Sequence, residues 1–156
     1  MDTSKKSPKE QCRMILNKVK LNDFISHKNT ELDLGYGINV VVGPNGAGKT
    51  SILDAISFAL FNDYDGRGKK ENLINSRANK CKVAVEFTEG GIKYAVDWSM
   101  ERNKSAKGGL YRLQDSTRTM LAQGGGNAVI PEIEKILGMD KSMFVQSIYV
   151  LSLIHI

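Results

Sequence analysis

Apolar and polar residues alternate along several stretches of this chain, which is the pattern of β-strands with one buried face. From Cys81 to Phe87 every second side chain is apolar, and Ile92 to Arg102 repeats this alternation. Thr88-Glu89-Gly90-Gly91 lies between the two stretches and supplies turn residues, so they predict an antiparallel hairpin. A similar alternation, with lysines between apolar positions, runs from Met14 to Phe24. Further strands are expected over His27–Leu34, which is more polar, and over Leu110–Leu113.

Helical periodicity appears in two other segments. Between Lys49 and Phe61, apolar residues recur at spacings of three and four, so this segment predicts an amphipathic helix. Pro131 suits the first turn of a second helix, and Gly138 suits its end. The run Gly124-Gly125-Gly126 lacks a lysine and a preceding buried strand, so it is interpreted as a flexible linker. Asp140 is a candidate cap for a further short helix.

The most informative segment precedes the first helix. Ile38 to Val42 is rich in β-branched residues, which suits a buried parallel strand. Gly43 to Thr50 then reads G-P-N-G-A-G-K-T and matches the phosphate-binding loop G-x-x-x-x-G-K-[ST]. Strand, glycine-rich turn and helix, in this order, form the structural context that the motif requires. The sequence therefore predicts an α/β fold of the P-loop NTPase class, with a mixed sheet that carries the loop and an antiparallel hairpin layer.

The loop residues have defined physical roles in nucleotide binding. Gly46 and Gly48 let the backbone approach a phosphate closely, so that successive N–H groups form an anion nest at the helix N-terminus. Lys49 is the catalytic candidate because it would reach the β- and γ-phosphates of ATP, and the Thr50 hydroxyl would ligate Mg²⁺. Ser51 is placed to hydrogen-bond a phosphate oxygen. The candidate nucleotide contacts in the loop are Asn45, Gly46, Ala47, Gly48, Lys49, Thr50 and Ser51.

Hydrolysis requires more than this loop. Phosphoryl transfer also needs a carboxylate that holds Mg²⁺ and a group that positions the attacking water. In P-loop enzymes the carboxylate ends a separate apolar strand. Val83–Glu86 and Tyr94–Asp97 come nearest to that pattern, but neither matches it. We therefore expect the chain to bind ATP and, by itself, to hydrolyse it barely if at all.

Length and composition narrow the class of protein. The chain has 156 residues, of which 41% are hydrophobic, so it suits one domain or a piece of a larger one. It contains no apolar run of about 18 residues, the length that suggests a membrane span. Residues 1–12 lack a signal-peptide core and are expected to form a disordered basic tail. Cys12 and Cys81 are isolated and suit free thiols, which indicates a cytoplasmic or nuclear protein that is not secreted.

The net charge of +5 is unevenly distributed, because basic residues gather between Gly66 and Lys82. Such a cluster can follow a nucleic-acid backbone, and it can equally be a solvated loop. Few aromatic residues lie between the basic ones, so base stacking is not indicated. The candidate DNA contacts are Arg67, Lys69, Lys70, Arg77 and Lys80.

The loop and its flanks resemble a known group of proteins. G-P-N-G-A-G-K-T looks like the loop of ABC-type ATPases, and its flanks resemble the DNA-associated, chromosome-maintenance branch. Residues 13–150 are similar to the N-terminal half-head of the SMC-like double-strand-break repair ATPases, the Rad50 and SbcC family. The segments that carry the resemblance are N-D-F-I-S-H (Asn22–His27), S-I-L-D-A-I-S-F-A-L-F (Ser51–Phe61), L-I-N-S (Leu73–Ser76), the G-x-x-Y hairpin (Gly91–Tyr94) and F-V-Q-S-I-Y-V (Phe144–Val150), whose end also predicts a strand over Ser147–Val150.

This resemblance implies a function. Two heads would sandwich two ATP molecules, and their closure would create a DNA-binding surface and regulate a partner nuclease, without a membrane. Ile74, Asn75 and Ser76 become further candidate nucleotide contacts. Many members carry a basic residue where this chain has Ile25, which we expect to pack instead. Residues 151–156 stand in place of the family's glutamine loop, so the chain is interpreted as a fragment whose end need not be native.

Other functions remain open from the sequence. Phe24 lies near the place of the adenine-stacking aromatic residue of ABC transporter subunits. A small-molecule phosphotransferase would need paired arginines over the transferred phosphate, for which Arg67 and Arg77 are the candidates. A DNA-binding module that acts independently of ATP is the remaining alternative.

Overall fold

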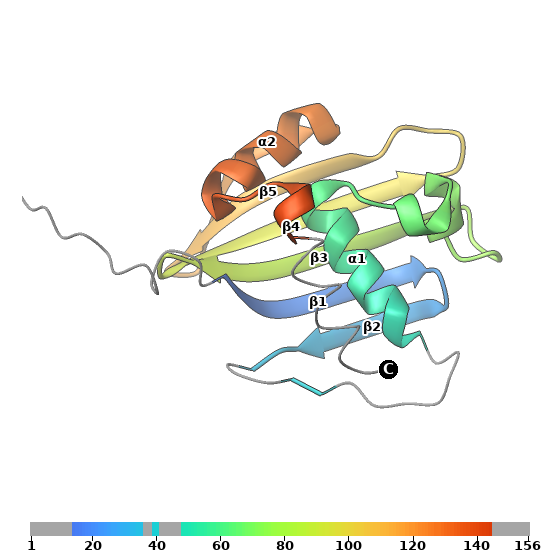
Figure 1. The fold of residues 1–156 in the computed structure, drawn as a ribbon, viewed down its shortest axis with the longest axis horizontal. Coiled ribbons are helices and arrows are strands. Elements are labelled where there is room, and N and C mark those ends of the chain that lie inside the picture. Colours follow the sequence, from blue (N-terminus) through green and yellow to red (C-terminus); the bar gives the residue numbers. More distant parts are fainter. Residues whose placement is uncertain (1–13, 36–38, 41–47, 145–156) are drawn as a thin grey trace, which may run out of the picture.

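Six antiparallel strands form one sheet in the order β2-β1-β3-β4-β5-β6 (Figure 1). The computed structural model describes residues 14–35, 39–40 and 48–144. Strands that follow one another in the chain pair with each other, except β2 and β3. After β2 the chain leaves the sheet to form a helix, and it returns as β3, which pairs with β1. The strands are β1 (Ile15–Phe24), β2 (His27–Asp33), β3 (Lys80–Glu89), β4 (Ile92–Glu101), β5 (Lys107–Gln114) and β6 (Thr117–Gly124).

Both α-helices lie on the same face of this sheet (Figure 1). Helix α1 (Lys49–Phe61) contacts β1, β3 and β4, whereas α2 (Gly126–Leu137) contacts β5 and β6. Two 3₁₀ turns, η1 (Asp65–Arg67) and η2 (Lys70–Leu73), connect α1 to β3. In the described part of the chain, no helix has the length and apolar character needed to cross a membrane.

The core lies between the sheet and these helices. The apolar positions of β3 that the alternation predicted are all buried, and Trp98 of β4 packs edge-on against Phe58 of α1. The indole Nε1 of Trp98 donates a hydrogen bond of 2.9 Å to the carbonyl oxygen of Ala59, which satisfies its polar atom inside the core. Burial also raises the pKa of the Cys81 thiol to about 12, because the thiolate is disfavoured away from water. This thiol is therefore a packing group at neutral pH.

The β3–β4 hairpin has the turn that its sequence predicts. Gly90 and Gly91 have φ angles of 60° and 78°, and the flanking residues Glu89 and Ile92 pair in register. Two successive positive φ angles are the requirement of the tight hairpin turn that matches the right-handed strand twist. Ile92 is the exception to the predicted buried face, since 41% of it is exposed at the start of β4.

The C-terminal elements differ from the prediction. The three glycines are not a linker: Gly124 ends β6, Gly125 caps α2, and Gly126 is the first residue of that helix. Pro131 therefore lies inside the helix rather than in its first turn. Val129 and Ile133 are fully buried on either side of it, so packing offsets the helical hydrogen bond that the proline removes.

Strand β6 was missed because it is an edge strand whose residues are mostly exposed on both faces. Its sequence, T-R-T-M-L-A-Q-G, has no period-two alternation from which a buried face could be recognised. Strand β5 is longer than the predicted Leu110–Leu113, because Gly108 and Gly109 also pair with β4 and β6. Gly138 ends α2 with a φ of 65°, as predicted, and the Asp140 side chain caps the next turn by accepting a bond of 2.9 Å from Met143 N.

The parallel strand expected before the phosphate-binding loop is not found at the described residues 39–40. Val40 lies outside any strand and is 77% exposed, so its placement in a buried strand is wrong. Its predicted neighbours at 38, 41 and 42 fall outside the described residues, as do the tail at 1–12 and residues 145–156. The α/β class is confirmed, but every pairing between described strands is antiparallel. The six described strands pair among themselves, in the order β2-β1-β3-β4-β5-β6.

Substitution of Gly108 tests the packing of the core. A Cβ at this position would lie 2.6 Å from the Trp98 ring, which is buried and cannot move aside. We expect Gly108→Ala to lower the free energy of unfolding by roughly 2 kcal/mol in a urea titration. Gly66→Ala is the control, because a Cβ there meets no atom within 4 Å. Equal stability of the two variants would contradict the close packing of Trp98 on Gly108.

Candidate phosphate-binding helix terminus

Helix α1 begins at Lys49, at the C-terminal end of the phosphate-loop motif. Gly48 precedes it with a φ of 91°, a left-handed conformation that residues with a Cβ rarely adopt. The first N–H groups of a helix have no partner within the helix, so this terminus is positively polarised. Thr50 is exposed there, and Lys49 is half-buried. The loop residues Gly43 to Ala47, including the predicted contacts Asn45 and Gly46, lie outside the described residues.

His27 and Ser26 pack directly against the end of the loop. The Nε2 atom of His27 lies 2.9 Å from the carbonyl oxygen of Gly48, and its Nδ1 atom lies 2.9 Å from the Thr30 hydroxyl. A Cβ on Gly48 would lie 2.8 Å from Ser26 Oγ and 2.5 Å from His27 Nε2. The glycine is therefore required by close approach as well as by its φ angle. The sequence motif contained both residues, but it assigned no role to either.

Ser51 points toward the protein rather than toward solvent. It is 4% exposed, and its hydroxyl lies 3.4 Å from Nη2 of Arg67. The same guanidinium donates two hydrogen bonds, of 2.6 and 3.0 Å, to Oδ2 of Asp54. Arg67, a predicted DNA contact, is thus held against α1 by an ion pair. Its neighbour Lys69 caps η2, and Lys70 is the first residue of that turn.

Residues 74–75, directly after η2, contact the β1–β2 turn that contains Ser26 and His27. Ile74 is 4% exposed and forms a bridge with Phe24, so its side chain belongs to the core. The Asn75 amide donates a bond of 2.7 Å to the Ile25 carbonyl, and its oxygen accepts a bond of 2.9 Å from Arg77 N. Ile25 packs against the core as expected, with a left-handed φ of 51° that these bonds maintain. Of the three predicted contacts in this segment, only Ser76 is exposed.

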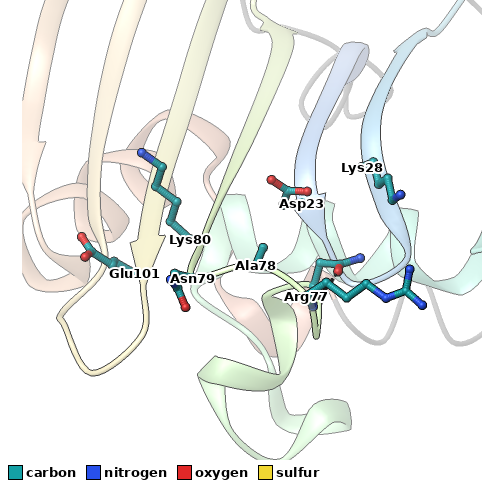
Figure 2. Close-up of a pocket in the computed structure, with 8 residues that line it drawn as sticks. Asp23, Lys28, Arg77, Ala78, Asn79, Lys80 and Glu101 are labelled. Carbon is teal, nitrogen blue, oxygen red and sulfur yellow. Dashed lines mark hydrogen bonds between the residues drawn. The ribbon is translucent and has the colours of Figure 1, made fainter.

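A groove opens beside this segment, between the ends of β1 and β4 (Figure 2). Its volume is about 690 Å³. Lys80 and Glu101, on the paired strands β3 and β4, border one side, while Asp23, Lys28 and Arg77 border the other (Figure 2). The predicted DNA contacts Arg77 and Lys80 therefore share the groove with two carboxylates. Such a mixed-charge groove does not favour a polyanion strongly.

A second group of basic residues lies on the face of the sheet opposite α1 and α2, here called the open face. Lys82 of β3, Ser99 of β4 and Lys107 of β5 are direct cross-strand neighbours there. Among the described residues, neither lysine has an ion-pair partner within 4 Å. Together with Lys20 they line a shallow groove of about 360 Å³, which also includes Asp97. That carboxylate is engaged by Arg118 at 2.7 Å.

The described residues do not supply a complete hydrolytic centre. Glu86 and Asp97, the carboxylates that came nearest to the required pattern, form ion pairs with Lys93 and Arg118 on the open face. No group of three His, Cys, Asp or Glu side chains that could hold a metal ion occurs in the part of the chain that the structure describes. The oxygen that suits Mg²⁺ at the start of α1 is the exposed Thr50 hydroxyl.

These features can be compared with known proteins. A family model described as an AAA domain matches residues 18–153. The chain belongs to this AAA domain family. The match covers the phosphate-loop motif, α1 and all of the described strands except the first residues of β1.

Curated relatives of this AAA domain are named DNA double-strand break repair Rad50 ATPases. The relative from Thermoplasma acidophilum is 35% identical over 138 residues, which are 87% of this chain and 15% of that protein. The relative from Methanocaldococcus jannaschii is 33% identical over 142 residues, which are 88% of this chain and 13% of that protein. The resemblance to the Rad50 and SbcC family is confirmed, and the chain spans a small part of these relatives' length.

Solved structures support the fold. A structure from work on ATP-driven dimerization and DNA-stimulated activation of SMC ATPases superimposes with a TM-score of 0.61 and 23% identity. The match covers 79% of this chain and 77% of that chain. The recombination mediator protein RecF with ATP gives a TM-score of 0.61 at 17% identity, over 71% of this chain and 30% of RecF.

The position of Arg67 leads to a stability prediction. Because Arg67 and Asp54 are 32% and 27% exposed, their ion pair is partly shielded from water. We expect Arg67→Ala to lower the free energy of unfolding by about 1 kcal/mol in a urea titration. Lys69→Ala, at an exposed neighbouring cation, is expected to change it by less than about 0.5 kcal/mol. If the two variants lose the same stability, Arg67 is not held by Asp54 in the way described.

Proposed function

We propose that this chain is the ATP-binding, N-terminal part of a DNA double-strand-break repair ATPase. The observation that carries the proposal is the start of α1 at Lys49, directly after a left-handed glycine, at the end of a complete phosphate-loop motif. The names of the relatives support the repair function. They also favour it over an ABC transporter subunit, a phosphotransferase or a DNA-binding module that acts without ATP.

The nucleotide would bind with its phosphates at the N-terminus of α1. The helix terminus favours an anion, Lys49 would contact the β- and γ-phosphates, and the N–H groups of the loop would surround them. Ser51 is the weakest of the proposed loop contacts, because its hydroxyl faces Arg67. Ile74 and Asn75, which were predicted to contact the nucleotide, are proposed instead to support the site indirectly. Ile74 is buried in the core, and the Asn75 amide binds the Ile25 carbonyl. Ser76 keeps its exposed position beside them.

Mg²⁺ fits this site as a partner of the nucleotide. The ion keeps several water ligands and takes further oxygen donors from phosphates, so a single hydroxyl can be one of its few protein ligands. Thr50 supplies that hydroxyl. The ion would neutralise phosphate charge, and the chain by itself is proposed to bind ATP without efficient turnover. Catalysis in the whole protein would use a second copy of the head and residues from beyond this segment.

DNA is the proposed macromolecular partner. The proposed location of the protein is the cytoplasm, in association with the nucleoid, or the nucleus. The open face offers a cross-strand row of Lys82, Ser99 and Lys107 that includes no carboxylate. Lys20 lies beside this row and is paired with Glu31. Rows of this kind bind the phosphate backbone without reading its sequence. We infer that this face contributes more than the predicted cluster, because Arg67 pairs with Asp54 and because Arg77 and Lys80 share a groove with carboxylates. Regulation of a partner nuclease belongs to the same proposal.

Nucleotide binding can be tested at the two loop side chains. Lys49→Ala is expected to weaken ATP binding by roughly ten- to a hundred-fold, because a charge-assisted bond to phosphate is lost. Thr50→Val is expected to weaken binding of Mg-ATP but not of ATP in EDTA. Fluorescence titration with a labelled ATP analogue measures both effects, with Lys104→Ala as the control. Unchanged affinity of Lys49→Ala, or rapid ATP turnover by the isolated chain, would contradict the proposal.

The open face is tested by the salt dependence of DNA binding. The double variant Lys82→Gln/Lys107→Gln is expected to bind duplexes of different sequence less tightly and to the same degree. The slope of log affinity against log salt should fall by about 2, because two phosphate contacts are lost. Fluorescence anisotropy at several salt concentrations gives this slope. Lys135→Gln, an exposed lysine on α2, is the control; an equal effect of this variant would argue against the open face.

A further inference from the structure

The contact between His27 and Gly48 links two segments that are far apart in the chain. His27 is the first residue of β2, and Gly48 directly precedes α1. Nε2 of His27 lies 2.9 Å from the Gly48 carbonyl oxygen, which can only accept a hydrogen bond. The ring must therefore carry a proton on Nε2. We propose that His27 is a positioning residue that orients the phosphate-binding end of α1, an inference that rests on the proposed nucleotide site.

The second ring nitrogen of His27 supports this assignment. Nδ1 lies 2.9 Å from the Thr30 hydroxyl, which is able to donate as well as accept. In the neutral ring, Thr30 donates to Nδ1 and Nε2 donates to Gly48, so both nitrogens are paired and one tautomer is selected. The imidazole is consequently fixed between β2 and the loop end, with both of its polar atoms engaged.

By orienting the Gly48 carbonyl, His27 also orients the N–H of Lys49, which is a hydrogen-bond donor for phosphate. The peptide bond is planar and trans, so the carbonyl oxygen of Gly48 and the N–H of Lys49 point in opposite directions within one rigid unit. His27 holds the oxygen on the β2 side, and the Lys49 N–H is thereby directed away from β2. This N–H belongs to the anion nest that the loop motif predicts. His27 thus orients a backbone donor without contacting the nucleotide itself.

The surrounding residues hold His27 in place. The turn between β1 and β2 is fastened by two bonds, from Ile25 N to Leu73 O at 2.8 Å and from the Asn75 amide to Ile25 O at 2.7 Å. Ser26 Oγ and the His27 ring would both collide with a Cβ on Gly48. The turn and the loop end are therefore packed against each other, and a lost hydrogen bond cannot be replaced by closer approach.

The first test uses the protein without nucleotide. With ¹⁵N-labelled histidine, NMR correlation spectra distinguish a proton on Nε2 from one on Nδ1, and loss of the signal in His27→Gln identifies His27 among the two histidines of the chain. The expected result is a proton on Nε2 of His27. A neutral ring protonated on Nδ1 would overturn the assignment, because that tautomer cannot donate to Gly48.

The second test uses a matched pair of variants. The side-chain nitrogen of glutamine can take the place of Nε2, whereas that of asparagine takes the place of Nδ1. His27→Gln is expected to bind Mg-ATP within about three-fold of the unchanged protein, and His27→Asn roughly ten-fold more weakly, because one hydrogen bond to the loop is lost. The two variants should have the same thermal midpoint without nucleotide.

Three outcomes of these tests are distinct. Equal Mg-ATP affinity of His27→Gln and His27→Asn would overturn the positioning role. A lower thermal midpoint of His27→Asn that accounts for its weaker binding would also overturn it, because His27 would then be a general stability residue. If the unchanged protein binds no Mg-ATP although its His27 carries the expected proton, the proposed nucleotide function fails while the contact itself stands.

Discussion

The packing of α1 against β1, β3 and β4 is the interaction on which the candidate site depends. Ala55, Phe58 and Ala59 are fully buried, and Ala59 accepts the hydrogen bond from Trp98. Trp98 can lie this close to the sheet because Gly108 on the neighbouring strand has no side chain. Since most helical stability comes from tertiary packing, these contacts determine where the helix N-terminus lies. His27 and Asn75 then adjust the orientation of that terminus within a position that the core has set.

The two faces of the sheet serve different purposes in the proposed function. The covered face holds α1 and therefore the nucleotide, whereas the open face presents Lys82 and Lys107 for a polyanion. Both faces share the same strands, because successive side chains in a strand point to opposite sides. Trp98 and Ser99 illustrate this arrangement: one packs on α1 and its neighbour lies in the lysine row.

Much of the fold could be predicted from local patterns. The alternation in β1, β3 and β4 and the helical spacing of α1 each report a buried face, and Gly48 and Asn62 mark the ends of that helix with left-handed conformations. Strand β6 could not be predicted, since an edge strand with exposed faces has no buried face to report. The start of α2 was also misplaced, because a proline was taken as an N-terminal signal where packing of Val129 and Ile133 tolerates it.

The candidate site was predicted only where a motif is contiguous. Lys49 and Thr50 were found from the loop, but the His27 contact spans 21 residues and the Arg67–Asp54 pair spans 13, so neither is visible locally. The Lys82–Ser99–Lys107 row depends on the register of three strands, which composition does not give. The central claim is most directly tested by ¹H–¹⁵N NMR spectra of the labelled protein during titration with Mg-ATP. The largest shift changes are expected for the amides of Gly48 to Ser51. Changes confined to the open face or to the Arg77 groove, with none at the start of α1, would contradict it.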